Sequence, residues 1–304
     1  MKKFALLIFA AFVLTCCTQR LPPTPVEISR ECRMTVAEIP TSIETSEKRS
    51  CPSGMIEITG DYCITLTHRC LAGRTQDWKP VRCPNGCPTP HFCDTFVEGS
   101  AVCATKSIRG SDGRMKNVSN VVLKHFCIDD YEYPNRIGET PTVMVTWYRA
   151  KELCEAAGKR LCGDDEWTLA CEGPERRPYP YGWTRDNTAC NIDHDQRAIG
   201  PNWGALGARA PEAIRNAEVA RLDQRVPIGA SPRCISPYGV HDMAGNVDEW
   251  TTNVTRAAIT RNKSFFKGGH WLRGARNRCR PITDGHTPDF SGYAEGFRCC
   301  ADPK

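Results

Sequence analysis

The chain has 304 residues, of which 40% are hydrophobic, with 24 glycines and 22 prolines, a composition typical of a folded, loop-rich protein rather than a disordered one. This length allows one large domain with accessory segments, or two domains. The formal net charge is +5 and falls to +3 without Lys2 and Lys3, an excess too small to indicate nucleic-acid binding.

Residues 1–17 resemble the signal peptide of a bacterial lipoprotein. Lys2 and Lys3 precede an unbroken apolar run at 4–14, which is too short to span a bilayer and suits a signal peptide. The run ends in Leu-Thr-Cys-Cys, so we expect cleavage before Cys17 and lipidation of Cys17. The alternative is an ordinary signal peptide with two incidental cysteines. We expect an outer-membrane-anchored lipoprotein, periplasmic or surface-exposed, held in the membrane by its acyl chains.

The next segment and the cysteines indicate an exported, disulfide-rich domain. Residues 18–50 are polar and contain several prolines, which predicts a flexible tether. Residues 51–304 are expected to form the folded domain. Of 19 cysteines, 17 remain after Cys16 and Cys17, and in an exported chain this density predicts disulfides rather than metal thiolates. Because 17 is odd, at least one thiol has no partner within the chain.

A cysteine-rich insertion separates the first two predicted strands. Short apolar alternation predicts one strand in residues 51–63, and we assign the matching strand to 126–135. Between them, residues of about 64–124 show little periodicity and bury little core, so cross-links must hold them together. The cysteine spacing also fits zinc, which an oxidising compartment disfavours. Residues 110–120 are predicted to be a loop. The cysteines of this insertion are Cys70, Cys83, Cys87, Cys93 and Cys103.

Two helices are predicted in the middle of the chain. Residues 143–162 contain the first, with Thr146 as N-cap and Gly158 as the residue that ends it by adopting a positive φ. Residues 164–171 form the second, with acidic residues at its positive N-terminal end. The apolar face of the first helix is marked by Trp147, Ala150, Cys154 and Leu161.

Three blocks in the C-terminal third carry a family resemblance. They read YGVHDMAGNVDEW at 238–250, GGHW at 268–271 and GFRC at 296–299. Together with AGKRL at 157–161 and YPYG at 179–182, they resemble the formylglycine-generating enzymes, also called sulfatase-modifying factors. That family consists of copper oxidases that convert a cysteine to formylglycine. The resemblance implies an α+β fold, a loop-rich variant of the C-type-lectin fold that is stabilised by disulfides and calcium.

The resemblance also implies particular disulfides and a calcium site. Cys154 is expected to pair with Cys299, and Cys171 with Cys279. The implied ligands of a structural Ca²⁺ are the side chain of Asp242, the carbonyls of Gly245 and Val247, and the carboxylate of Glu249, oxygen ligands that suit this cation. The alternative is a tight turn in which Glu249 forms a salt bridge. A further pair, Cys190 with Cys234, is a weaker expectation, and Cys127, Cys162 and Cys300 have no assigned partner.

The copper site of the family is missing. Its two cysteines should follow the Gly-Gly block, but residues 272–278 contain no thiol, and copper(I) requires soft thiolate ligands. Copper is therefore not expected. Asp248 and His270 also stand where the family has tryptophan and serine. We expect a rebuilt groove whose candidate functional residues are Asp248, His270, Arg276 and His286, with Arg273, Arg278 and Asp289 beside them.

This groove supports three hypotheses. Its arginines, with Arg280, favour an anionic or peptide-carboxylate ligand, although a solvated basic face is the alternative. We predict a non-catalytic binding module that presents its loop face to a peptide, glycan or envelope protein. Two histidines and a carboxylate also suit a transition metal, which keeps an oxidoreductase of the formylglycine-generating or non-heme-iron type as the alternative. The third hypothesis is an envelope component that uses the insertion as its contact surface.

Overall fold

The computed structural model describes residues 50–75, 79–82, 92–109, 113–197, 210–256 and 260–304. The predicted signal peptide, Cys17 and all of the predicted tether except Ser50 lie outside these residues. Within the described part, no helix has the length and apolar character needed to cross a membrane.

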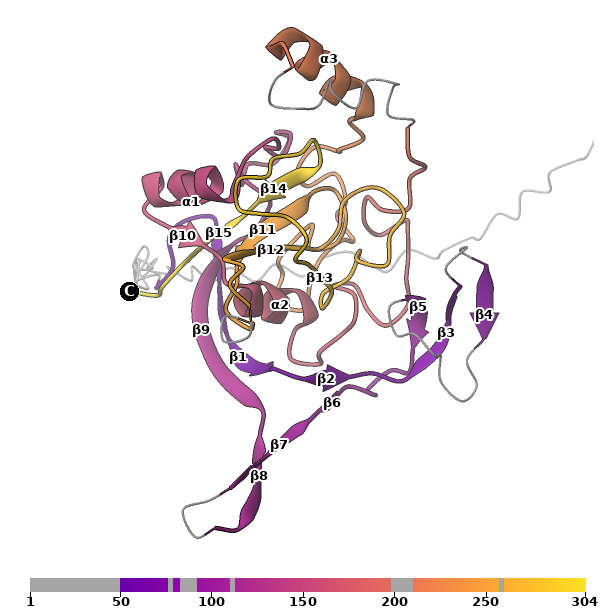
Figure 1. The fold of residues 1–304 in the computed structure, drawn as a ribbon, viewed down its shortest axis with the longest axis vertical. Helices are drawn as coiled ribbons and strands as arrows, with labels where there is room; N and C mark the ends of the chain where they lie inside the picture. The colour runs from indigo at the N-terminus through magenta and orange to yellow at the C-terminus, as the bar shows by residue number, and fades with distance from the viewer. Residues whose placement is uncertain (1–49, 76–78, 83–91, 110–112, 198–209, 257–259) are drawn as a thin grey trace, which may run out of the picture. The chain divides into compact units, whose positions relative to one another are not determined.

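The first sheet joins the two ends of the described chain. Its strand order is β1-β9-β15-β10. β1 (Met55–Cys63) runs antiparallel to β9 (Val121–Asp129) along its full length. β9 then pairs with β15 (Cys299–Ala301), which pairs with the short β10 (Arg160–Leu161) (Figure 1). The sheet therefore places the C-terminal block next to the first strands.

The second strand of this sheet lies earlier than we expected. Residues 126–129 belong to β9, but residues 130–135 form a turn instead of continuing the strand. Asn135 has φ 61°, and its side-chain oxygen accepts a hydrogen bond from the backbone nitrogen of Tyr131 at 2.9 Å. A local side-chain bond of this kind gives the backbone an alternative to the sheet, which is why the strand ends at Asp129.

The second sheet carries the candidate groove. Its order is β13-β12-β11-β14, with β11 at Asp248–Thr252, β12 at Ser264–Lys267, β13 at Ile282–Thr283 and β14 at Glu295–Phe297. β11 is antiparallel to β12 and parallel to β14. This arrangement brings the three C-terminal sequence blocks side by side.

Both predicted helices are present. α1 (Trp147–Ala156) has Thr146 as N-cap, whose hydroxyl accepts a hydrogen bond from the Arg149 nitrogen at 3.1 Å. The chain leaves this helix through Gly158 at φ 69°. α2 (Asp164–Glu172) begins with three acidic residues, and every residue in it is buried.

A third helix, α3 (Glu212–Leu222), was not predicted. Among its described residues only Leu222 is buried, so the segment shows no apolar stripe from which a helix is recognised.

Two aromatic clusters form the core of the domain. Trp167 and Phe126 are at the centre of one cluster, and Trp250 and Phe297 are at the centre of the other. Disulfides link the helices to the C-terminal segment, and both pairs that the resemblance implies are formed. The disulfides between described cysteines are Cys51–Cys127, Cys63–Cys103, Cys70–Cys93, Cys154–Cys299, Cys162–Cys300, Cys171–Cys279 and Cys190–Cys234.

The insertion consists of short antiparallel pairs with their own cross-links. β2 (Leu66–Thr67) pairs with β6 (Val102–Cys103), and β3 (Cys70–Arg74) pairs with β4 (Pro80–Arg82) and β5 (Cys93–Phe96). β7 (Thr105–Arg109) and β8 (Met115–Ser119) form a hairpin (Figure 1).

The prediction of a loop over residues 110–120 was wrong for the part that forms β8. The polar composition of this segment gives no strand pattern, and β8 is stabilised instead by its pairing with β7. Cys83 and Cys87 lie outside the described residues.

Candidate functional site

A buried ion pair lies under the turn for which calcium ligands were predicted. The carboxylate of Glu249 accepts hydrogen bonds from Arg298 Nε at 2.7 Å and Nη2 at 2.8 Å, and from Trp167 Nε1 at 2.8 Å. The side chains of Arg298 and Glu249 are 0% and 1% exposed. Breaking such a pair by removing one partner leaves an uncompensated buried charge, so this contact fixes β11 against β14 and β15.

Further carboxylates share this buried site. Burial raises the pKa of Asp242 to about 6, and Asp242 Oδ2 accepts a long hydrogen bond from the Gly229 nitrogen at 3.4 Å. Glu132 is fully buried and accepts from Asn246 Nδ2 at 2.7 Å and the Val247 nitrogen at 3.1 Å. Burial, followed by the charges of Asp242 and Glu249, raises the pKa of Glu132 well above its ordinary value. Sequence reasoning missed Glu132, because it contacts this turn across more than a hundred residues.

At this turn the structure shows the salt bridge of Glu249 with Arg298 that was the alternative to a calcium site. Asp242 and Glu249 both lie near enough to Glu132 to raise its pKa. A Cβ atom at Gly245 would lie 2.3 Å from the carbonyl oxygen of Asn191, so this turn requires glycine. Among the described residues no three His, Cys, Asp or Glu side chains gather as a metal-binding group.

The rebuilt groove is organised around an ion pair between Asp248 and Arg276. Asp248 is buried at the start of β11, where Oδ1 accepts from the Gly269 nitrogen at 3.2 Å and Oδ2 pairs with Arg276 Nη1. The same Arg276 nitrogen donates to Thr283 Oγ1 on β13. The guanidinium is therefore held in one orientation by β11 and β13.

Both candidate histidines lie within electrostatic reach of this ion pair. Burial lowers the pKa of His270, and the charge of Asp248 partly opposes that shift. His270 Nδ1 accepts a hydrogen bond from the Leu272 nitrogen at 3.3 Å. Burial also lowers the pKa of His286, whose ring stacks on Phe290 with 4.0 Å between centroids. Of the four candidates, Asp248 and Arg276 therefore form the ion pair, and the charges of this pair act on His270 and His286.

Two flanking candidates lie further from the groove. Asp289 is exposed, and Arg273 forms a 3.4 Å ion pair with the exposed Asp195. Glu295, which sequence reasoning missed, is partly buried and lies opposite Asp248 in the parallel pairing of β11 and β14. Burial, followed by the charge of Asp248, raises the pKa of Glu295 to about 7. The position of Glu295 next to Asp248 follows from the strand register and could not be predicted from a local sequence pattern.

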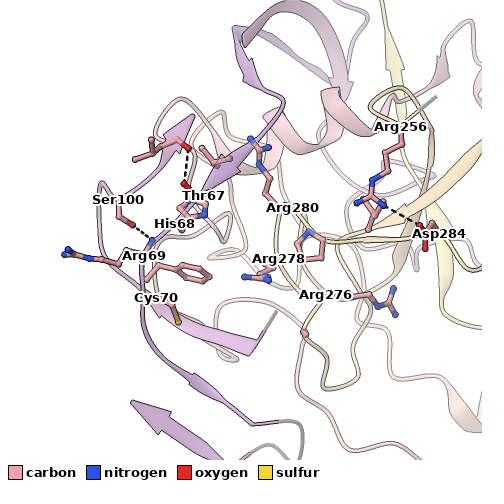
Figure 2. A pocket seen from close by; sticks show the side chains of 16 residues that line it. Thr67, His68, Arg69, Cys70, Ser100, Arg256, Arg276, Arg278, Arg280 and Asp284 are labelled. Carbon is pink, nitrogen blue, oxygen red and sulfur yellow. Dashed lines mark hydrogen bonds and ion pairs between the residues drawn. The ribbon is translucent and has the colours of Figure 1, made fainter. Parts of the chain in front are cut away.

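The arginines of the loop after β12 take different roles. Arg280 forms a bidentate pair with the buried Glu172, with both distances 2.6 Å, and so has a structural role. Arg278 is 9% exposed, and its guanidinium carbon lies 5.6 Å from the ring centroid of Phe96 in the insertion. These side chains border a cavity of about 830 Å³ (Figure 2). The basic face is therefore partly enclosed rather than fully solvated.

Residues 96–303 match the family model described as the sulfatase-modifying factor enzyme 1-like domain. The chain belongs to this family. This match confirms the α+β fold of the formylglycine-generating-enzyme type that the sequence blocks imply.

Curated relatives of this family member include active and inactive proteins. The inactive C-alpha-formylglycine-generating enzyme 2 of Bos taurus is 29% identical over 172 residues, covering 54% of this chain and 50% of that protein. The hercynine oxygenase of Mycolicibacterium smegmatis is 30% identical over 124 residues, covering 39% of this chain and 23% of that protein. The chain spans about half the length of the first of these relatives. The solved structure of PvdO from Pseudomonas aeruginosa matches 84% of this chain and 97% of its own, with 14% identity and a TM-score of 0.41.

Proposed function

We propose that this protein is an exported, lipid-anchored and non-catalytic member of the family, which binds a ligand on the loop face around Asp248 and Arg276. The main observation in support of this proposal is the fixed orientation of the Arg276 guanidinium, which is held by Asp248 and Thr283. It belongs to the segment 272–278, in which the family resemblance places the copper cysteines and this chain has no thiol. A relative whose name describes it as inactive supports a binding role on this scaffold.

The geometry suits recognition of a negatively charged group. A planar guanidinium presents several N–H donors in a fixed fork that matches carboxylate and phosphate oxygens. Because Asp248 and Thr283 already orient Arg276, little conformational entropy is lost when a ligand binds. Burial lowers the pKa values of His270 and His286, which favours their neutral forms. Because His270 Nδ1 already accepts from the Leu272 nitrogen, the other ring nitrogen of neutral His270 is an N–H donor.

Peptide and glycan arrays test this proposal with the Arg276→Gln variant and a matched control, Arg149→Gln on the exposed side of α1. We expect saturable ligands that bind the wild type and the control but not the Arg276 variant. The proposal fails if the protein instead oxidises a cysteine-containing peptide with consumption of oxygen.

The second candidate function is an oxidoreductase with a rebuilt metal site. The observation in its favour is that the charge of Asp248 acts on both His270 and His286. Because no three His, Cys, Asp or Glu side chains of the described residues gather as a metal-binding group, a metal would have to draw these three together. Imidazole and carboxylate ligands suit iron and copper(II). Stoichiometric iron or copper that is lost in His270→Ala would establish this alternative.

Calcium and the lipid anchor complete the proposal. Ca²⁺ bound through Asp242, Gly245, Val247 and Glu249 would supply positive charge to the buried carboxylates and stabilise the turn. We expect EDTA to lower the melting temperature and added Ca²⁺ to restore it, and no change on chelation would rule out the site.

For the anchor, metabolic labelling with a radioactive fatty acid should mark the wild type and leave Cys17→Ser unlabelled.

A further inference from the structure

The cavity beside Arg278 has two walls of different origin. One wall is the loop after β12, which contributes Arg276, Arg278 and Arg280. The other wall belongs to the cysteine-rich insertion and includes Leu66, Phe96 and Val102. Figure 2 shows Arg278 extending toward the side that carries His68, Arg69 and Cys70. The insertion therefore converts an open basic loop into a pocket.

The arginines reach this pocket from a segment of turns and bends. Within it, the Arg278 nitrogen donates to the Arg276 carbonyl at 2.6 Å. Arg276, Arg278 and Arg280 line the cavity, whereas Asn277 is 1% exposed and Cys279 is 0% exposed and bonded to Cys171. The buried Asn277 and the disulfide of Cys279 therefore anchor this segment to the body of the domain.

Direct contacts join the two walls. Arg280 Nη1 donates to the carbonyl of Cys63 at 2.7 Å, and Cys63 is bonded to Cys103, the neighbour of Val102. On the other side, the guanidinium of Arg278 lies over the ring of Phe96. The backbone nitrogen of Phe96 in turn donates to the carbonyl of Trp183 at 2.9 Å. These contacts hold the insertion at a fixed distance from the arginine loop, so the pocket is preformed.

The lining combines positive charge with apolar surface. Five arginines, Arg69, Arg256, Arg276, Arg278 and Arg280, line the cavity, and Asp284 is the acidic residue among the lining side chains. The apolar contribution includes Leu66, Phe96, Val102, Pro281 and Ile282. A cavity of about 830 Å³ is large enough for a drug-sized molecule and much larger than a bare phosphate or carboxylate.

We propose that this pocket binds an oxyanion attached to an apolar body, with the carboxylate or phosphate group on Arg278 and the apolar part against Phe96 and Val102. This inference rests on the proposed binding function and names its ligand class. Guanidinium groups pair with carboxylate and phosphate in the same fork geometry, so both head groups share the chemistry. The insertion then supplies the ligand-binding wall that a bare family scaffold would lack.

Isothermal titration calorimetry on the full chain tests the proposal with three probes that share one apolar body: 1-naphthoate, 1-naphthyl phosphate and neutral 1-naphthamide. We expect at least one anion to bind about ten-fold or more tightly than the amide. Its affinity should fall as salt rises from about 50 to about 500 mM, because screening weakens the contact. The preference between the two anions identifies the head group.

Three variants locate the binding site. Arg278→Gln should weaken the anion about ten-fold or more, but Arg278 is buried, so two exposed positions carry the test if that variant fails to fold. Val102 is 60% exposed, and Val102→Asp places a repelling charge in the pocket; Arg69→Gln removes a cation from the insertion wall. The matched controls are Leu123→Asp, at a position that is 69% exposed outside the lining, and Arg149→Gln, and both should bind as the wild type does.

The outcomes separate this inference from the proposed function. If the anions bind but Val102→Asp and Arg69→Gln leave their affinity unchanged, the loop face binds ligands elsewhere and the pocket assignment is wrong. If no probe prefers its charged form, the ligand class is wrong even where array ligands bind through Arg276. If the protein instead oxidises a thiol peptide, the proposed function is wrong, and the inference that rests on it is wrong as well.

Discussion

The lectin-like body and the cysteine-rich insertion are stabilised in different ways. The body buries large aromatic side chains, such as Trp167 and Trp250, together with the Arg298–Glu249 ion pair. The insertion has short strands, with Leu71, Val81 and Val102 exposed, and two described disulfides cross-link it. A segment with so little buried surface depends on cross-links and on its contacts with the body.

This difference indicates a division of labour. The body provides a rigid support that positions Asp248, Arg276 and Arg278, whereas the insertion adds a wall without adding much to global stability. Changes in the body should therefore alter global unfolding, and changes in the insertion should alter binding.

The largest expected effect is the loss of global stability when a disulfide of the body is removed, compared with the removal of one within the insertion. In the chain-entropy model, removing Cys154–Cys299, which closes 145 residues, costs at most about 5 kcal/mol of unfolding free energy. The same model gives about 3 kcal/mol for Cys70–Cys93, which closes 23 residues, but this cost should fall on local unfolding of the insertion rather than on the body. The double serine variant of this disulfide should leave the global urea transition almost unchanged but speed proteolysis of the insertion. Equal losses of global stability in both double variants would break the comparison.

The second largest expected effect is the loss of stability when the buried ion pair between Glu249 and Arg298 is broken. Glu249→Gln leaves Arg298 buried without a matching charge, so we expect the free energy of unfolding to fall by roughly 3–5 kcal/mol. The matched control, Glu152→Gln, removes an exposed charge on α1 that pairs with Arg149, and it should not shift the urea midpoint measurably. A small effect of Glu249→Gln would show that the body does not depend on this pair.

The raised pKa of Glu295 predicts that the unfolding free energy of the body depends on pH. Because burial and Asp248 raise the pKa of Glu295 to about 7, the folded state binds more protons than the unfolded state between pH 4.5 and 7. The stability that this group contributes is complete below about pH 4.5 and is lost as pH rises through 7. Glu295→Gln should remove this slope and gain up to about 3 kcal/mol relative to wild type between pH 5 and 8. Parallel urea titrations that show identical slopes would contradict the assignment.

The smallest expected effect concerns a helix cap. Thr146→Ala removes the hydroxyl that accepts from the Arg149 nitrogen, which should cost about 1 kcal/mol of unfolding free energy. Thr146→Ser keeps the hydroxyl and serves as the control. If the alanine and serine variants unfold at the same urea concentration, the cap does not stabilise α1.

Local patterns explain what the sequence predicted. Thr146 and Gly158 mark the ends of α1 through capping rules, and the alternation in residues 51–63 marks β1. The disulfides Cys154–Cys299 and Cys171–Cys279 came from the family resemblance. The loop 272–278 was recognised as changed because two thiols are missing from a short, well-defined position.

Long-range packing explains what the sequence did not predict. Glu132 reaches the site through a turn, and Glu295 reaches it through the strand register. Glu295 directly precedes the GFRC block, but nothing in that block indicates that it lies opposite Asp248. The pocket required the insertion to fold back on the arginine loop, a contact between Phe96 and Arg278 that spans most of the domain. β8 and α3 have polar sequences whose periodicity is too weak to distinguish a strand or helix from a loop.

Elemental analysis of the mature, oxidised protein, purified without chelator or a histidine tag, tests the central claim most directly. If the family scaffold now serves binding, we expect about one calcium per chain and no stoichiometric copper or iron. One equivalent of copper or iron per chain, lost on His270→Ala, would contradict the claim and identify an oxidoreductase.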